Sequence, residues 1–248
     1  MRLLSVVLVA LLAGCSSAPK TISDEQRMEI TENFQGLQEN YRERLQKNSQ
    51  DYPAAVSLAR VYFKGRDLEA ATYYLDQIPD EVCNTLEGCW ITRADVAYAN
   101  EDFDNSKVFI DYSLAVQKDV YAAKNLYGII MANEGEFQTA KRYFFEARLG
   151  FKDENAIRNN LAMTEMMEGR YAEAAERLMP LYKKGQLDPT IKANLIVSLM
   201  RSNQEHVVKQ MLLQEHNEDD ALLYFAQLKD DLDTWPNTIG QSTTDEEI

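Results

Sequence analysis

The residues with the most distinctive chemistry in this sequence are three cysteines, Cys15, Cys83 and Cys89, and two histidines, His206 and His216. Five residues separate Cys83 from Cys89, so this pair lacks the C-x-x-C spacing of redox motifs. Zinc takes four ligands, and both histidines lie far from the cysteines in the sequence. The sequence also shows no nucleophile with a base, no glycine-rich phosphate loop and no H-E-x-x-H helix. It predicts no enzyme activity, no catalytic residue, no metal site and no cofactor.

Cys15 follows an N-terminal targeting segment. Residues 1–14 combine Arg2 with an apolar run that is too short to span a membrane. Small residues directly precede Cys15, and this ending resembles the bacterial lipoprotein signal, in which cleavage precedes a cysteine that then receives acyl chains. Ser16, in place of aspartate, resembles the outer-membrane sorting pattern. The resemblance implies lipidation of Cys15 and permanent anchoring at the outer membrane, facing the periplasm. An ordinary secretory signal with an incidental cysteine is the alternative.

Export would place Cys83 and Cys89 in an oxidising compartment, where disulfides persist. If the intervening residues were helical, the Cα atoms of the two cysteines would be about 9 Å apart, whereas a disulfide requires less than about 7 Å. A bond therefore needs a loop, and Pro79 and Gly88 both interrupt the helical pattern in this region. We predict a disulfide across a non-helical segment, with a redox protein that uses the pair as the alternative.

The chain is strongly acidic. Its 26 basic and 40 acidic side chains give a net charge of −14, and loss of residues 1–14 would remove Arg2 and leave a net charge of −15. This charge argues against nucleic acid as a partner. With 248 residues, of which 45% are hydrophobic, the chain is long enough to bury a sizeable helical core.

A 34-residue repeat defines the elements that position these residues. The series Gly135, Phe137, Ala140, Phe144 and Ala147 recurs 34 positions later as Gly169, Tyr171, Ala174, Leu178 and Leu181. The spacing predicts two amphipathic helices per unit, which bury their apolar faces only when units stack. The pattern resembles the tetratricopeptide repeat. The resemblance implies an all-α, right-handed superhelical solenoid of about five helix-turn-helix repeats with N-terminal and C-terminal capping helices, whereas a helical bundle with a chance echo is the alternative.

The repeat frame divides the rest of the chain. One inserted residue is expected between the first two repeats, and the fifth repeat lacks the glycine and the aromatic residue. A stripe of apolar residues from Ile30 to Leu45 predicts one continuous N-terminal helix. We expect a signal peptide at 1–14, a lipidated tether at 15–23, the N-terminal helix at 24–51, the repeats at 52–218, a C-terminal capping helix at 219–235 and a disordered acidic tail at 236–248.

In the tetratricopeptide family, the first helix of every repeat lines a concave groove, at the second, fifth, ninth, twelfth and thirteenth positions of the unit. The resemblance therefore implies a groove that is mostly apolar and amide-bearing and that departs from the basic pattern which binds acidic chain termini. Methionines suit an adaptable surface for an apolar peptide or helix, although some could pack between helices instead. The implied groove residues are Arg60, Phe63, Lys64, Ile91, Asp95, Tyr98, Asn125, Ile129, Asn133, Asn159, Met163, Met166, Met167, Val197, Met200 and Arg201.

A lipoprotein made almost wholly of such repeats resembles the TadD family of tight-adherence (Flp) pilus assembly lipoproteins. The resemblance rests on architecture and length, and it implies a periplasmic adaptor that binds the secretin or another pilus-assembly component. Two other adaptors are alternatives: a type IV pilus pilotin for the secretin, and an adaptor for cell-wall hydrolases or outer-membrane insertion machinery.

Overall fold

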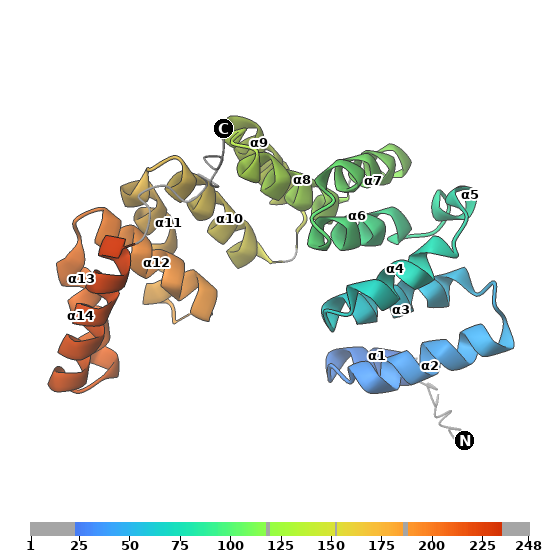
Figure 1. Cartoon of the computed structure of the whole chain (residues 1–248), viewed down its shortest axis with the longest axis horizontal. Helices are drawn as coiled ribbons and strands as arrows, with labels where there is room; N and C mark the ends of the chain where they lie inside the picture. The colour runs from blue at the N-terminus through green and yellow to red at the C-terminus, as the bar shows by residue number, and fades with distance from the viewer. Residues whose placement is uncertain (1–22, 118–119, 152, 186–187, 235–248) are drawn as a thin grey trace, which may run out of the picture.

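The computed structural model describes residues 23–117, 120–151, 153–185 and 188–234, and all regular elements within these ranges are α-helices (Figure 1). The predicted signal peptide, Cys15 and the predicted tail from residue 236 lie outside the described residues. The helices are α1 (Asp24–Ile30), α2 (Phe34–Lys47), α3 (Tyr52–Lys64), α4 (Leu68–Asp76), α5 (Asp80–Cys83), α6 (Cys89–Ala99), α7 (Phe103–Val116), α8 (Tyr121–Asn133), α9 (Phe137–Ala147), α10 (Glu154–Met167), α11 (Tyr171–Lys183), α12 (Pro189–Arg201), α13 (Glu205–Glu215) and α14 (Glu218–Thr234).

Five helix pairs form the repeats: α3–α4, α6–α7, α8–α9, α10–α11 and α12–α13. Every pair turns in the same way, because the residue two positions after the end of each first helix adopts a left-handed backbone conformation. The next residue's N–H then bonds a carbonyl five residues earlier, as in Glu136 to Met131 at 2.8 Å, which ends the helix. The left-handed residues are Arg66, Glu101, Gly135, Gly169 and Asn203, with φ between 60° and 80°.

The contacts between repeats give the array its curvature. The first helices α3, α6, α8, α10 and α12 contact one another in succession, whereas α4, α7, α9 and α11 each contact the first helix of the following repeat. First helices are therefore closer together than second helices. Figure 1 shows the resulting arc, with α6, α10 and α12 on its inner side and α7, α11 and α13 on its outer side.

Equivalent core positions in neighbouring repeats are filled in complementary ways. Gly128 in α8 lies against the ring of Phe144 in α9, and a Cβ atom added at Gly128 would be 2.6 Å from the Cε1 atom of Phe144. In the next repeat Ala162 and Leu178 occupy the same two positions, and both are fully buried. The smaller partner residue, leucine, leaves room for the methyl group that the phenylalanine excludes.

The N-terminal region forms two helices, so the prediction of one continuous helix at 24–51 is wrong. Helix α1 ends at Ile30 and α2 begins at Phe34, because Glu32 has a φ of 51° and the Asn33 side chain accepts a hydrogen bond from the Gly36 N–H at 3.0 Å. This cap starts a new helix. Ile30 is therefore 71% exposed, while Leu37 and Tyr41 of α2 are buried with residues of α3.

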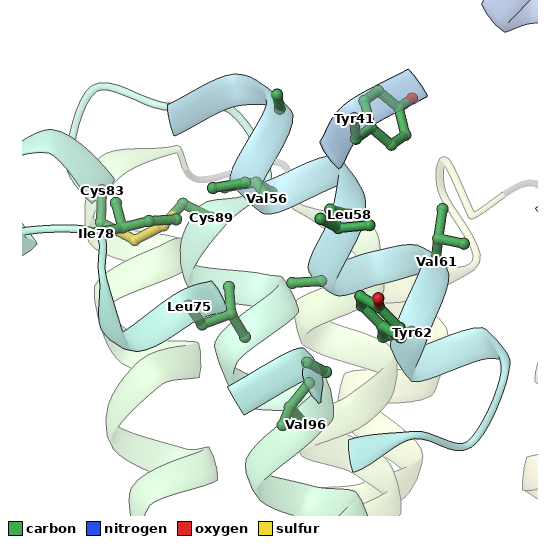
Figure 2. Packing of buried hydrophobic residues seen from close by; sticks show 14 of the residues in the cluster. Tyr41, Val56, Leu58, Val61, Tyr62, Leu75, Ile78, Cys83, Cys89 and Val96 are labelled. Carbon is green, nitrogen blue, oxygen red and sulfur yellow. A yellow bond between two sulfur atoms is a disulfide. The ribbon is translucent and has the colours of Figure 1, made fainter. Parts of the chain in front are cut away.

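Cys83 and Cys89 form the predicted disulfide across a non-helical segment between α5 and α6. Their Cα atoms are 5.3 Å apart, and Figure 2 shows the sulfur–sulfur bond beside Ile78 in the core. Trp90 donates a hydrogen bond from Nε1 to Asn84 Oδ1 at 3.0 Å, which holds the segment against α6. The inserted residue in the repeat frame is thus accommodated in a closed, hydrogen-bonded loop.

Candidate partner-binding surface

The ninth position of each repeat forms a row along the first helices. This position lies one residue after the residue that faces the second helix, such as Gly128 or Ala162, and so points about 100° away from it around the helix. The row changes from charged to apolar along the array. It consists of Arg60, which is exposed, and of Asp95, Ile129, Met163 and Val197, which are half-buried.

The charged end of the row is fixed by hydrogen bonds between repeats. Arg60 of α3 donates from Nη2 to Thr92 Oγ1 of α6 at 3.2 Å, and Thr92 donates to the Gly88 carbonyl oxygen at 2.7 Å. Burial raises the pKa of the Asp95 carboxyl from 3.8 to about 7, and the nearby positive charge of Arg60 opposes this shift. The N-terminal part of the surface therefore holds a cation next to a carboxyl group that titrates near neutrality.

Asparagine side chains connect the first helices of the last three repeats. Asn160 donates from Nδ2 to Asn125 Oδ1 at 2.9 Å, and Asn194 donates in the same way to Asn159 at 2.8 Å. Asn125 and Asn159 thus accept through their oxygen atoms, and within the described ranges their Nδ2 groups donate no hydrogen bond to the protein. Asn125 and Asn159 are among the groove residues that the resemblance implies, whereas Asn160 and Asn194 are not. The signal was present, since both donors lie 35 residues after their acceptors.

Met166 does not line the surface, so its prediction as a groove residue is wrong. Its side chain is 1% exposed and packs in the core with Ala174 and Leu178 of α11. The reason is its spacing, because Met166 lies four residues after Ala162 and therefore on the same face of α10, toward the second helix. Met163, in contrast, is only partly buried.

The remaining predicted groove residues are placed as follows. Lys64 is exposed, whereas Phe63 packs against the N-terminal core and Met200 against the C-terminal core. Asn133 is exposed and donates from Nδ2 to the Tyr98 hydroxyl at 3.2 Å. Ile91, Tyr98 and Met167 pack against the central core, and Arg201 donates to the Leu232 carbonyl oxygen at 2.8 Å. Arg201 therefore contributes to the attachment of α14.

Comparison with known proteins agrees with this architecture. A family model described as the tetratricopeptide repeat protein 21 C-terminal ARM domain matches residues 17–184. The chain belongs to this family. Among solved structures, the thermophilic TPR protein TTC0263 of Thermus thermophilus is 16% identical, with a TM-score of 0.59 over 71% of this chain and 95% of that chain. MamA is 12% identical, with a TM-score of 0.52 over 66% of this chain and 98% of that chain. No curated protein sequence matches the chain.

At these identities the two structures establish the fold of this TPR-like family member. The tetratricopeptide fold is a scaffold for protein–protein interaction, and such folds generally bind protein partners. The inner row of first helices is therefore the candidate site of this repeat scaffold, as the resemblance implied.

The disulfide lies in the packed N-terminal core, where the first repeat meets the second. Cys83 is 1% exposed and Cys89 is fully buried, so a partner thiol cannot reach the sulfur atoms without local unfolding. This burial favours a structural role over redox exchange. Beside the disulfide loop lies a hollow of about 880 Å³, whose apolar lining includes Leu86, Trp90 and Ile91. Ile91, one of the predicted groove residues, therefore also lines this hollow.

In the described part of the chain, no group of three or more His, Cys, Asp or Glu residues is arranged to hold a metal ion. None of the helices described is long and apolar enough to cross a membrane.

Proposed function

We propose that this chain is a lipid-anchored periplasmic adaptor that acts in assembly or localisation of the tight-adherence (Flp) pilus secretion apparatus. Its inner surface would bind a peptide or helix of the secretin or of another assembly component. The main support for this binding mode is a hydrogen bond between asparagine side chains that recurs at equivalent positions of successive first helices. It joins Asn160 to Asn125 and Asn194 to Asn159.

These contacts leave the two accepting asparagines with donors for a partner. The oxygen atoms of Asn125 and Asn159 are occupied by the neighbouring repeat, so their orientation is fixed and their Nδ2 groups remain for carbonyl oxygens of a bound segment. Ile129 and Met163 lie four residues further along the same helices and offer apolar contact. A segment with exposed carbonyl groups and apolar side chains fits this combination.

The anchor is the second part of the proposal, and it depends on the small residues before Cys15. Cells that express the Cys15→Ala variant should no longer incorporate labelled fatty acid into this protein. Labelling that persists in the variant would refute lipidation at Cys15.

The binding surface is tested by placing charge on its apolar positions. The double variant Ile129→Glu/Met163→Glu should lose pull-down of the pilus channel component, because a desolvated carboxylate opposes an apolar ligand. The matched control is Phe145→Glu/Leu149→Glu, which adds the same charge on α9 and just beyond its end, at side chains that are 50% and 79% exposed. The control should bind as wild type does.

Thermal unfolding of both variants separates binding from folding. We call Ile129→Glu/Met163→Glu the groove variant. If it melts near the wild-type temperature and still retrieves the channel component, the proposed surface is contradicted. If the groove variant melts much earlier, Asn125→Asp and Asn159→Asp replace it, because they change an amide donor into an acceptor at half-buried positions. Wild-type retrieval by both would equally contradict the proposal.

A further inference from the structure

Helix α14 carries an apolar face that no described part of the chain covers. Its other side packs into the array, with Ala221 3%, Phe225 8% and Leu232 9% exposed. Leu222 and Leu223 are 54% and 66% exposed. Together with Ala226, which is also exposed, they lie on one side of the helix at spacings of three and four residues. We call Asp219, Leu222, Leu223, Ala226 and Asp230 the α14 face.

The two ends of the array differ in this respect. Terminal elements of repeat proteins normally have a polar outer side, which keeps the array soluble. At the N-terminal end, Ile30 of α1 is a single exposed apolar side chain, and the exposed residues of α2 are all polar: Gln35, Glu39, Arg42, Glu43, Gln46 and Lys47. Helix α14 breaks this rule with two adjacent leucines, so the α14 face has the composition of a contact surface.

Charge decides which occupant suits this face. Asp219 lies one turn before the leucines and Asp230 one turn after Ala226, on the same side of the helix. Both are exposed. The one lysine of α14, Lys229, is within 3.3 Å of Glu205 and is therefore already paired. The α14 face is thus an apolar patch between two carboxylates.

This arrangement disfavours two occupants that the chain itself could supply, a second copy and its C-terminal segment. A second copy would bring carboxylates against carboxylates, and like charges brought together at an interface cost several kcal/mol. Residues 235–248 hold three acidic residues and no basic residue, so their charge also has the wrong sign.

We propose that the α14 face binds a basic amphipathic helix of a partner protein, with its apolar side on Leu222 and Leu223 and its lysine or arginine side chains near Asp219 and Asp230. The α14 face lies on the helix that closes the array, so this surface is separate from the row of first helices. The chain therefore offers two binding surfaces.

A synthetic leucine–lysine amphipathic helix, fluorescently labelled and titrated with the mature chain, is the probe. Leu222→Gln/Leu223→Gln should weaken its binding at least about tenfold, because the apolar contact is lost. The matched control Phe145→Gln/Leu149→Gln removes two exposed apolar side chains elsewhere and should bind within about twofold of wild type. Asp219→Asn/Asp230→Asn should weaken binding and reduce its dependence on salt.

Three results would overturn the proposal. The first is equal affinity of the wild type and Leu222→Gln/Leu223→Gln. The second is a dimer in sedimentation equilibrium that Leu222→Gln/Leu223→Gln dissociates, since a second copy would then occupy the face. The third is a photoreactive residue at position Leu223 that crosslinks to residues 235–248 of its own chain. Because the groove variants lie on other helices, failure of this proposal is distinguishable from failure of the proposed function.

Discussion

The contact between Gly128 and Phe144 makes a quantitative prediction about how the repeats are packed. A Cβ atom at position 128 would lie 2.6, 2.8 and 3.0 Å from three ring atoms of Phe144, which is 1% exposed and has no room to move. Such overpacking costs about 1 to 3 kcal/mol, and the better helix propensity of alanine offsets about 1 kcal/mol of it. Gly128→Ala should therefore lower the free energy of unfolding by at most about 2 kcal/mol.

The neighbouring repeat shows how the clash is relieved. Phe144→Leu alone should cost about 1 to 2 kcal/mol, because it leaves a partly filled cavity. The double variant Gly128→Ala/Phe144→Leu reproduces the pair Ala162 and Leu178, which packs without exposure in the next repeat. The double variant should consequently lose about 1 to 2 kcal/mol less than the sum of the single variants.

Urea unfolding followed by circular dichroism measures this coupling. The control is Ala162→Gly, which should cost about 1 kcal/mol through helix propensity and should show no coupling to Phe144→Leu. If the loss of unfolding free energy in Gly128→Ala/Phe144→Leu equals the sum of the two single-variant losses within about 0.5 kcal/mol, the packing at these positions is not complementary.

Three other predictions follow from single sites. Mass spectrometry of unreduced, alkylated protein should find Cys83 and Cys89 without alkyl groups, whereas two alkylated thiols would refute the bond; Cys83→Ser/Cys89→Ser should lower the free energy of unfolding by about 2 kcal/mol. Glu101→Gly should be about 1 kcal/mol more stable than Glu101→Ala in urea unfolding, because residue 101 has a φ of 62°; equal stability would contradict this. Asp95 has a raised pKa in the folded state, so the stability that its protonated form contributes is complete below about pH 4 and is lost as the pH rises toward 7. The free energy of unfolding of wild type should thus fall relative to Asp95→Asn between these values, and parallel pH profiles would argue against a buried carboxyl.

The helix pairs and their buried faces could be predicted from the sequence because they depend on local spacing. Ala140, Phe144 and Ala147 fall at three, seven and ten residues after Phe137, and all three are at most 1% exposed. The disulfide was predictable for a similar reason. Only five residues separate Cys83 from Cys89, and a helix-breaking glycine among them allows a loop that brings the two Cα atoms within disulfide distance. In both cases neighbouring residues decide the outcome.

The wrong predictions concern features that depend on a single side chain or on how the repeats stack. The break between α1 and α2 depends on one cap at Asn33, which the apolar stripe from Ile30 to Leu45 conceals. The repeat position of Met166 predicts that it lines the groove, but the stacking of α10 on α11 places it in the core. The contact from Asn160 to Asn125 joins different repeats, so it becomes visible only once the offset between neighbouring first helices is known.

Photocrosslinking in cells tests most directly whether the inner row of first helices binds the partner. A photoreactive amino acid would be placed at Asn133 or Arg60, which are exposed on first helices, or at Tyr112 or Phe145, which are exposed on second helices. We expect both inner positions to crosslink to the same component of the pilus secretion apparatus and neither outer position to do so. Crosslinks to that component from the outer positions alone would contradict this expectation.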